Sequence, residues 1–162
     1  MALRKLESIK STDKNSMSYW WKVKNPLKSV INFMLIYSAR FAPSLALKRS
    51  LYRLAGAKVG KDVSFGLGSV LDFFYPELIE IGENSIIGYN STILAHEFLI
   101  KELKTGKVKI GKGVLIGANC TILAGVEIGD GACISACSLV NSDVPAGAFF
   151  GGVPAKIIKR DH

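Results

Sequence analysis

Aliphatic residues recur at every sixth position through much of this chain, and this period constrains the fold more than any other feature. A six-residue period is neither the two-residue period of an ordinary strand nor the 3.6-residue period of a helix. It is typical of a parallel β-helix, in which three hexapeptides form one coil and stacked coils align their aliphatic side chains in an interior column. The sequence therefore predicts a mainly β fold. The repeated positions are Ile81, Ile87, Ile93, Ile110, Ile116, Ile122, Ile128, Ile134 and Val140.

The regular series is interrupted once. Ile93 and Ile110 are 17 residues apart, one short of the 18 that a full coil would take, so the chain must leave the regular path between them. His96 lies at the start of this excursion, and the other histidine of the chain is the last residue, His162. Loops that project from a rigid scaffold frequently carry binding and catalytic residues. His96 is therefore the first candidate functional residue.

The repeat divides the chain into two predicted parts. Residues 57–162 form the β-helix domain with a short basic C-terminal tail, because the repeat begins near Val59 and continues past an aromatic break at Phe73–Pro76. Residues 1–56 form a basic leader followed by capping helices. An open end of a β-helix exposes backbone groups and aliphatic side chains, so it needs such a cap.

Local signals place the helices of the first part. Residues 1–25 are expected to be mobile or loosely helical. Asn25-Pro26 favours a helix start, Pro43 interrupts that helix, and residues 45–54 are expected to form a second, amphipathic helix that Gly56 ends. Its basic residues are expected to face solvent; they are Lys48, Arg49 and Arg53.

The net charge of +8 comes from the first part of the chain. Residues 1–53 contain 11 Lys or Arg against Glu7 and Asp13, whereas residues 54–162 contain 10 basic and 11 acidic residues. A nearly neutral repeat domain argues against a nucleic-acid partner. The basic charge, together with Trp20 and Trp21, instead suggests peripheral contact of residues 1–53 with an anionic membrane surface.

Neither a secretory signal nor a membrane span is predicted. Residues 1–13 are polar and charged, and the apolar residues 30–42 fall short of the roughly twenty residues that a membrane helix requires. Cys120, Cys133 and Cys137 lack the spacing of a metal site and are expected to be buried free thiols. We therefore expect a cytoplasmic protein without a metal, free or peripheral at the inner membrane face.

Several segments resemble the hexapeptide-repeat acyltransferases, in particular the maltose and galactoside O-acetyltransferases and their polysaccharide-modifying relatives. The resemblance covers about residues 56–160. It implies a left-handed parallel β-helix, a homotrimer, and acetyl-CoA as co-substrate. The segments are Ile81–Ser85, Thr92–His96, Ile110–Gly117, Asp143–Pro145 and Gly151–Lys156.

Acyl transfer from a thioester to a sugar hydroxyl requires a base, because a hydroxyl is a weak nucleophile at neutral pH. Imidazole, with an unperturbed pKa of about 6.5, can accept this proton, so His96 is the predicted base. A base usually needs an orienting partner. The resemblance implies that this partner is Glu97 or Glu102 of the loop, or Asp72 from the preceding coil.

In these relatives acetyl-CoA lies in a groove between adjacent subunits of the trimer. The resemblance implies that Lys156 and Lys159 meet the nucleotide phosphates, while small side chains let backbone N–H groups approach the thioester. Leu115 replaces an aromatic residue, often Trp, and Ser142 replaces a basic residue, so cofactor contacts are expected to be fewer or differently placed. The residues expected along the arm are Leu115, Gly117, Ala118, Ser135 and Ala136, with Asn141 and Ser142 nearby.

The leading hypothesis is an acetyl-CoA-dependent O-acetyltransferase whose acceptor is a hydroxyl of a saccharide or of a lipid-linked glycan. The alternatives are an N-acetyltransferase acting on an amino sugar or amino acid, and a non-catalytic β-helix binding module. A γ-type carbonic anhydrase is also a β-helix, but it requires three zinc-binding histidines. His96 is the one internal histidine of this chain, which excludes that class.

Overall fold

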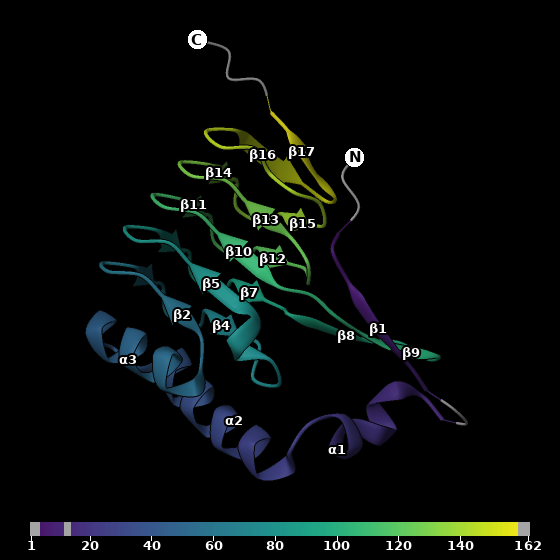
Figure 1. Ribbon diagram of the computed structural model, residues 1–162. Helices are drawn as coiled ribbons and strands as arrows, with labels where there is room; N and C mark the ends of the chain where they lie inside the picture. Colours follow the sequence, from purple (N-terminus) through teal and green to yellow (C-terminus); the bar gives the residue numbers. More distant parts are fainter. Residues whose placement is uncertain (1–3, 12–13, 159–162) are drawn as a thin grey trace.

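The computed structural model describes residues 4–11 and 14–158, and its centre is a parallel β-helix of four coils (Figure 1). Each coil contributes a short strand to three parallel sheets, here called side 1, side 2 and side 3. Side 1 contains β2 (Lys58–Val59), β5 (Ile79–Ile81), β10 (Val108–Ile110) and β13 (Glu127–Ile128). Side 2 contains β3 (Ser64–Phe65), β6 (Ile86–Ile87), β11 (Leu115–Ile116), β14 (Cys133–Ile134) and β16 (Phe149–Gly152), and β17 (Ala155–Ile157) adds to β16 as an antiparallel strand. Side 3 contains β4 (Val70–Leu71), β7 (Thr92–Ile93), β12 (Thr121–Ile122) and β15 (Leu139–Val140).

Successive coils are in register, so the residues of the six-residue period stack directly on one another. On side 3, Leu71 pairs with Ile93, Ile93 with Ile122, and Ile122 with Val140. All four side chains are buried. Removing this aliphatic column from water, at about 25 cal/mol per Å² of apolar surface, is the main stabilising term of the fold. The predicted parallel β-helix is confirmed.

Two insertions leave the β-helix at the same corner, between side 3 and side 1. An ordinary side takes six residues, but the chain takes ten from Leu71 to Ile81 and seventeen from Ile93 to Ile110. The insertions therefore add four and eleven residues. The interpretation of the second gap as a coil one residue short is wrong, because it is an ordinary corner that carries an inserted hairpin. Stacking of the two insertions on successive coils brings together residues that are distant in sequence.

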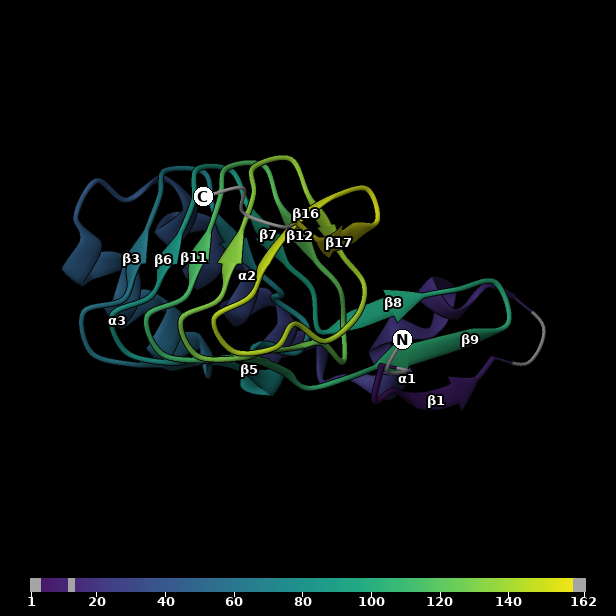
Figure 2. The same ribbon diagram turned by 90° about the horizontal axis from the view of Figure 1, so that it is seen from above.

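The longer insertion is a β-hairpin that projects from the coils (Figure 2). It consists of β8 (His96–Phe98) and β9 (Glu102–Thr105), and β1 (Glu7–Lys10) adds to β9 as a third antiparallel strand. The expectation of a mobile or loosely helical leader is wrong for β1, because the open edge of β9 offers backbone groups that this strand pairs. Residues 1–3 and 12–13 of the leader lie outside the described residues.

Helices lie across the open end of the first coil (Figure 1). They are preceded by the 3-10 turn η1 (Ser16–Tyr19), and comprise α1 (Trp20–Val23), α2 (Pro26–Phe41) and α3 (Leu45–Ala55). Asn25 caps α2 by accepting the Lys28 N–H at 3.2 Å. Gly56 ends α3 with a φ of 115°, a conformation that favours glycine. A second 3-10 turn, η2 (Pro76–Leu78), closes the shorter insertion.

Basic side chains of α3 bind the β-helix, so the prediction that they face solvent is wrong for Lys48, whereas Arg49 is half-buried and Arg53 is exposed. Lys48 is 2% exposed, and burial lowers its pKa. The physical reason is the open coil end: each coil donates its N–H groups to the next coil, which leaves the carbonyl oxygens of the first coil without a coil beneath them. Lys48 donates to Arg40 and Gly66, Arg49 to Val63, and Arg53 to Val59 and Gly60.

The helices in the described part of the chain include none that is long and apolar enough to cross a membrane.

Candidate active site

His96 and Asp72 meet at the corner where the two insertions stack. Asp72 follows directly on β4, and His96 is the first residue of β8. Oδ2 of Asp72 contacts Nδ1 of His96. The Asp72 side chain is fully buried, whereas the His96 side chain is 13% exposed. The predicted base thus has a buried carboxylate on one ring nitrogen while its side chain keeps some access to solvent.

The carboxylate of Asp72 also ties the two insertions together. Oδ2 accepts the backbone N–H groups of Ala95 at 2.8 Å and His96 at 3.1 Å. Oδ1 accepts those of Phe74 at 2.9 Å and Tyr75 at 3.1 Å. A carboxylate can accept on both oxygens, and each of these partners is an N–H donor. Asp72 therefore fixes the backbone of both segments as well as the ring of His96.

This contact assigns the protonation pattern of the imidazole. An acceptor at Asp72 Oδ2 requires the hydrogen of the neutral His96 ring to be on Nδ1, which leaves the lone pair on Nε2. That tautomer can remove a proton from a substrate at Nε2. The buried carboxylate then stabilises the imidazolium that forms, as the aspartate does in a catalytic triad.

Aromatic rings surround the imidazole. The ring centroids of Phe98, Phe74 and Tyr75 lie 4.8, 5.1 and 5.8 Å from that of His96. Trp20 of α1 packs on Phe74 at 5.7 Å between centroids. Apolar walls exclude water from the ring, which strengthens the electrostatic interaction between the carboxylate and the imidazole.

Tyr75 adds a neutral polar group to this enclosure. Burial, followed by the charges of Asp72 and Glu77, raises the pKa of the Tyr75 phenol. Lys24 stabilises the position of the ring, since its Nζ lies 4.2 Å from the Tyr75 centroid and pairs with Glu77. The phenol therefore remains a hydrogen-bond donor at neutral pH.

Glu97 and Glu102, the other predicted partners of the base, are engaged elsewhere. Successive side chains of a strand point to opposite faces, and the carboxylate of Glu97 pairs with Arg4 instead of His96. Glu102 pairs with Lys104 at 3.0 Å. Of the three acidic candidates, Asp72 on the preceding coil has the carboxylate that contacts the His96 ring.

Most of the residues predicted along the acetyl-CoA arm gather on side 2 and at the corner that follows it. Leu115 points outward from β11 and is 43% exposed. Gly117 lies directly over Ala136: a Cβ added to Gly117 would meet the Ala136 backbone nitrogen at 2.5 Å. Ala118 and Ser135 belong to the same two stacked corners. This corner therefore exposes backbone with little side-chain cover, which suits the close approach of an extended ligand.

The other predicted cofactor residues are placed differently. Asn141 and Ser142 follow β15 at the corner that carries the insertions, so side 3 separates them from Gly117. The Oδ1 atom of Asn141 is buried and has no hydrogen-bond partner among the described residues. Lys156 is exposed on β17, at the end of side 2, and Lys159 lies outside the described residues.

Side 3 also separates the Gly117 corner from His96. A strand of side 3 lies between them, and His96 lies beyond the far end of this side. The catalytic and cofactor groups predicted from the sequence are thus on two different edges of one chain.

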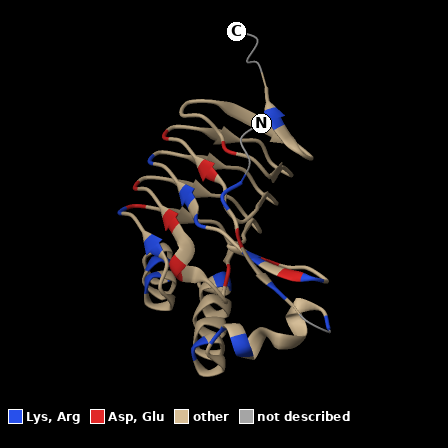
Figure 3. Ribbon diagram, turned by 45° about the vertical axis from the view of Figure 1, so that its right-hand side comes forward, with Lys and Arg blue, Asp and Glu red and all other residues tan. Residues whose placement is uncertain are grey.

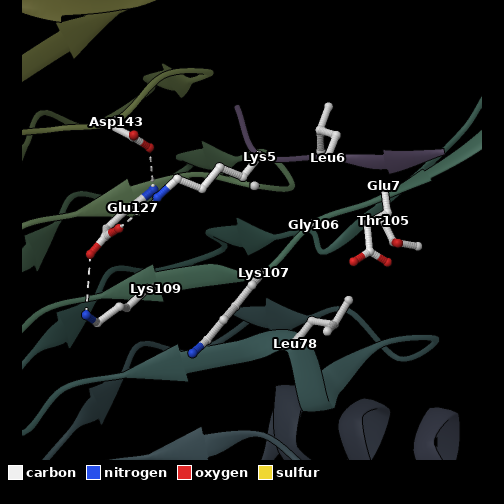
Figure 4. Close-up of a pocket in the computed structure, with 11 residues that line it drawn as sticks. Lys5, Leu6, Glu7, Leu78, Thr105, Gly106, Lys107, Lys109, Glu127 and Asp143 are labelled. Carbon is white, nitrogen blue, oxygen red and sulfur yellow. Dashed lines mark hydrogen bonds and ion pairs between the residues drawn. The ribbon is translucent and has the colours of Figure 1, made fainter. Parts of the chain in front are cut away.

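A separate cleft of about 480 Å³ opens beside side 1, and Figure 4 shows its lining. Lys5 approaches Glu127 at 3.9 Å, and Lys109 pairs with Glu127 at 3.3 Å. The cleft charges are thus partly paired with each other. His96 is not among the lining residues, so this cleft is not the candidate active site.

Sequence reasoning missed the aromatic enclosure and the ion pair of Arg4. The run Phe73-Phe74-Tyr75 signalled a break in the repeat, and its aromatic character was the available hint of a site wall. Trp20 carried no comparable signal, because its contact with Phe74 depends on the path of the leader around the hairpin.

Comparison with known proteins identifies the family of this chain. Residues 107–142 match the family described as bacterial transferase hexapeptide (six repeats). The chain is 50% identical over 157 residues to the protein named "Putative acetyltransferase YvoF" of Bacillus subtilis (strain 168), covering 96% of this chain and 91% of that protein.

Solved structures share the architecture. A hexapeptide-repeat-containing acetyltransferase of Vibrio cholerae O1 biovar eltor, complexed with acetyl-CoA, has a TM-score of 0.68 at 20% identity, covering 82% of this chain and 86% of that one. A galactoside acetyltransferase in complex with coenzyme A has a TM-score of 0.67 at 25% identity, covering 85% and 82%. These likenesses identify the coils as those of a left-handed parallel β-helix.

Proposed function

Because the chain belongs to the hexapeptide-repeat acetyltransferases, we propose that it transfers the acetyl group of acetyl-CoA to a hydroxyl of a saccharide, with His96 as the general base. The observation that carries this proposal is the contact between the buried Asp72 carboxylate and Nδ1 of His96. It leaves Nε2 as the proton acceptor in the one internal histidine of the chain.

The chemistry follows from this tautomer. The acceptor oxygen forms a bond to the acetyl carbonyl carbon as the carbon–sulfur bond of the thioester breaks. The proton of the hydroxyl passes to Nε2 of His96 and then to the departing thiolate, so the base is regenerated in each cycle. Asp72 holds the ring and stabilises its transient positive charge.

Acetyl-CoA fits the exposed backbone of the corner at Gly117 and Ala136, where small side chains allow close approach. Side 3 separates this corner from His96 within one chain. We therefore propose a homotrimer in which the Gly117 corner of one subunit lies beside the His96 hairpin of the next, with Lys156 near the nucleotide phosphates. Closed cyclic symmetry would repeat this composite site at each interface.

The experiment that tests the base is acetyl transfer by His96→Ala with a panel of saccharides and amino sugars. Loss of a general base typically lowers the rate by about 10²–10⁴, while acetyl-CoA binding measured by calorimetry should be retained. His162→Ala removes the other histidine and serves as the matched control. Near-wild-type transfer by His96→Ala would show that another group is the base.

The same panel separates ester from amide products. An O-acetyl ester is cleaved by alkaline hydroxylamine, whereas an N-acetyl amide is not. Products that resist hydroxylamine and form only with amino sugars would replace the proposed reaction by N-acetylation. Sedimentation velocity tests the assembly, because a stable folded monomer that transfers acetyl groups would contradict the composite site.

A further inference from the structure

The helical cap has an apolar outer surface. On α2, Leu27 is 70% exposed and Met34 is 58% exposed, and on α3 Leu54 is 71% exposed. Helices that cover a core normally turn their apolar stripe inward and their polar residues to water. The cap surface consists of Leu27, Val30, Ile31, Met34, Tyr37 and Phe41 of α2 with Leu47 and Leu54 of α3.

The inward position of polar residues in α2 and α3 has a structural cause on the side of the helices that faces the β-helix. The buried residues of the two helices combine polar and apolar side chains: Ser29, Asn32, Ile36 and Ala39 of α2, and Lys48, Tyr52 and Ala55 of α3. Polar side chains of α3 face inward because they satisfy the unpaired carbonyl oxygens of the first coil. The cap therefore needs its polar groups inside, but nothing in the β-helix requires its outer surface to be apolar.

All charged residues of the segment that carries the cap surface are basic. From Lys14 to Lys61, both included, the sequence has ten Lys or Arg and no Asp or Glu. Figure 3 accordingly shows blue but no red on α1, α2 and α3. Lys22 and Lys28 are exposed at the end of the cap that contains α1. An apolar surface whose neighbouring charges are mainly basic, with the acidic Glu77 paired to Lys24, is complementary to an anionic surface.

Amphipathic aromatic residues lie at the same end. Trp21 is 51% exposed and packs against Trp20 and Tyr19. Trp and Tyr are enriched where a protein meets the boundary between lipid and water, because each ring combines an apolar body with a polar atom.

The cap surface is also connected to the candidate active site. Phe33 of α2 stacks on Tyr37 of the cap surface, with ring centroids 5.5 Å apart, and contacts Phe73 at 5.6 Å. Phe73 contacts Phe74 at 4.3 Å. Phe74 in turn contacts the ring of His96. A continuous row of aromatic rings thus leads from α2 to the base.

We propose that the cap surface docks on an anionic lipid bilayer, with the helices lying in the interface and not crossing it. The apolar side chains enter the region below the headgroups, and Lys22 and Lys28 contact anionic lipids. Docking places His96 close to the membrane surface. The acceptor of the acetyl group is then a hydroxyl of a lipid-linked glycan, and this assignment alone rests on the proposed function.

A second copy of the chain fits this surface less well than a bilayer does. Two such caps face to face would bring basic segments together without any acidic partner between Lys14 and Lys61. Assembly of β-helices through their coil edges, as proposed above, leaves the capped end uncovered.

Co-sedimentation with vesicles tests the proposal. The probe is vesicles of equal parts phosphatidylglycerol and phosphatidylcholine, compared with phosphatidylcholine alone, at low and high salt. The wild-type protein should bind the anionic vesicles and lose affinity with salt. Leu27→Gln with Met34→Gln should weaken binding at least about tenfold, because both apolar side chains leave the interface; glutamine keeps the helix propensity.

Matched controls separate docking from general stickiness. Ile86→Gln with Ile157→Gln removes two β-helix side chains of similar exposure, 50% and 66%, and should bind like wild type. Lys22→Gln with Lys28→Gln should lower affinity, by about fivefold per lysine. Lys109→Gln with Lys112→Gln lowers the net charge equally on the coils and should have a smaller effect.

Three results would overturn the proposal. The first is that the wild-type protein does not bind anionic vesicles at low salt, and the second is that the cap and control variants lose vesicle binding equally. The third is light scattering that shows the protein with both Leu27→Gln and Met34→Gln to be a smaller oligomer, because a second copy of the chain would then be the occupant of the cap surface. Acetyl-CoA binding and transfer to soluble saccharides are measured on the same proteins. A wild-type protein that neither binds acetyl-CoA nor transfers acetyl groups would contradict the proposed function, whereas the result for vesicle binding does not depend on that function.

Discussion

Oδ2 of Asp72 receives both the ring Nδ1 and, at 3.1 Å, the backbone N–H of His96 from the next coil. The backbone N–H groups of Ala95, Phe74 and Tyr75 share the same carboxylate. A group that accepts from donors on both oxygens has to be a carboxylate, since a carboxamide would turn an NH₂ toward one set of donors. One residue therefore serves folding and ring orientation together.

Asp72→Asn is predicted to lower both activity and stability. Transfer should fall by about 10²–10⁴, because the ring loses the acceptor that holds its Nδ1 tautomer. The free energy of unfolding should fall by roughly 1–3 kcal/mol, because one pair of backbone N–H groups loses its acceptor. Steady-state kinetics well below the melting temperature and thermal unfolding measure the two effects separately. A variant with lower stability but unchanged kcat would reduce Asp72 to a structural role.

Glu97→Gln, unlike Asp72→Asn, is predicted to leave activity near the wild-type value. Its carboxylate pairs with Arg4 on the other face of the hairpin, and both side chains are partly exposed. The pair should contribute less than about 1 kcal/mol to stability, and kcat should stay near the wild-type value. If kcat instead fell as far as in Asp72→Asn, then Glu97 would move to the ring during the reaction.

Lys48→Met tests how the β-helix end is capped. The Nζ atom donates to the carbonyl oxygens of Arg40 at 3.1 Å and Gly66 at 3.0 Å. Methionine fills the space but leaves these oxygens without a donor, which should cost roughly 1–3 kcal/mol in the free energy of unfolding. Lys61→Met, at a side chain that is 85% exposed, should change it by less than about 0.5 kcal/mol. Chemical denaturation compares the two, and equal effects would contradict the capping role.

Gly117→Ala tests the contact between stacked corners. The new Cβ would lie 2.5 Å from the Ala136 nitrogen, so the coils must separate, at a cost on the order of 1–3 kcal/mol or more. Gly113→Ala is the matched control, because its φ of 61° causes strain of about 1–2 kcal/mol while no atom lies within 4 Å of the new Cβ. Thermal unfolding should show Gly117→Ala to be the less stable variant. The opposite order would mean that the coils yield easily here.

Lys156→Ala is predicted to raise the KM for acetyl-CoA with little change in kcat. A phosphate contact far from the thioester contributes equally to the ground state and the transition state. The effect should shrink as salt increases, since the lysine is exposed. Lys112→Ala, which removes an exposed lysine paired with Glu83, is the control. A KM that does not respond in Lys156→Ala would place the phosphates elsewhere.

The period of the sequence was sufficient to predict the coils, because a hexapeptide column is a local pattern that repeats unchanged in space. It also singled out His96, since a break in a regular series is visible without knowledge of the fold. The local signals at Asn25, Pro26 and Gly56 placed the helix ends correctly for the same reason. Strand β1 and the inward basic residues of α3 were not predictable in this way, because their partners are backbone groups left open by other elements.

The sequence by itself thus determined the column of stacked aliphatic residues, the single internal histidine and the concentration of basic charge in residues 1–53. Only the tertiary structure decided which carboxylate reaches the imidazole. Asp72 and His96 are 24 residues apart, and they meet because insertions of unequal length leave the same corner of successive coils. Glu97, the neighbour in sequence, points to the other face of its strand. The position of a residue along the chain determines the side or corner of the β-helix on which it lies, but the stacking of coils determines which residues it contacts there.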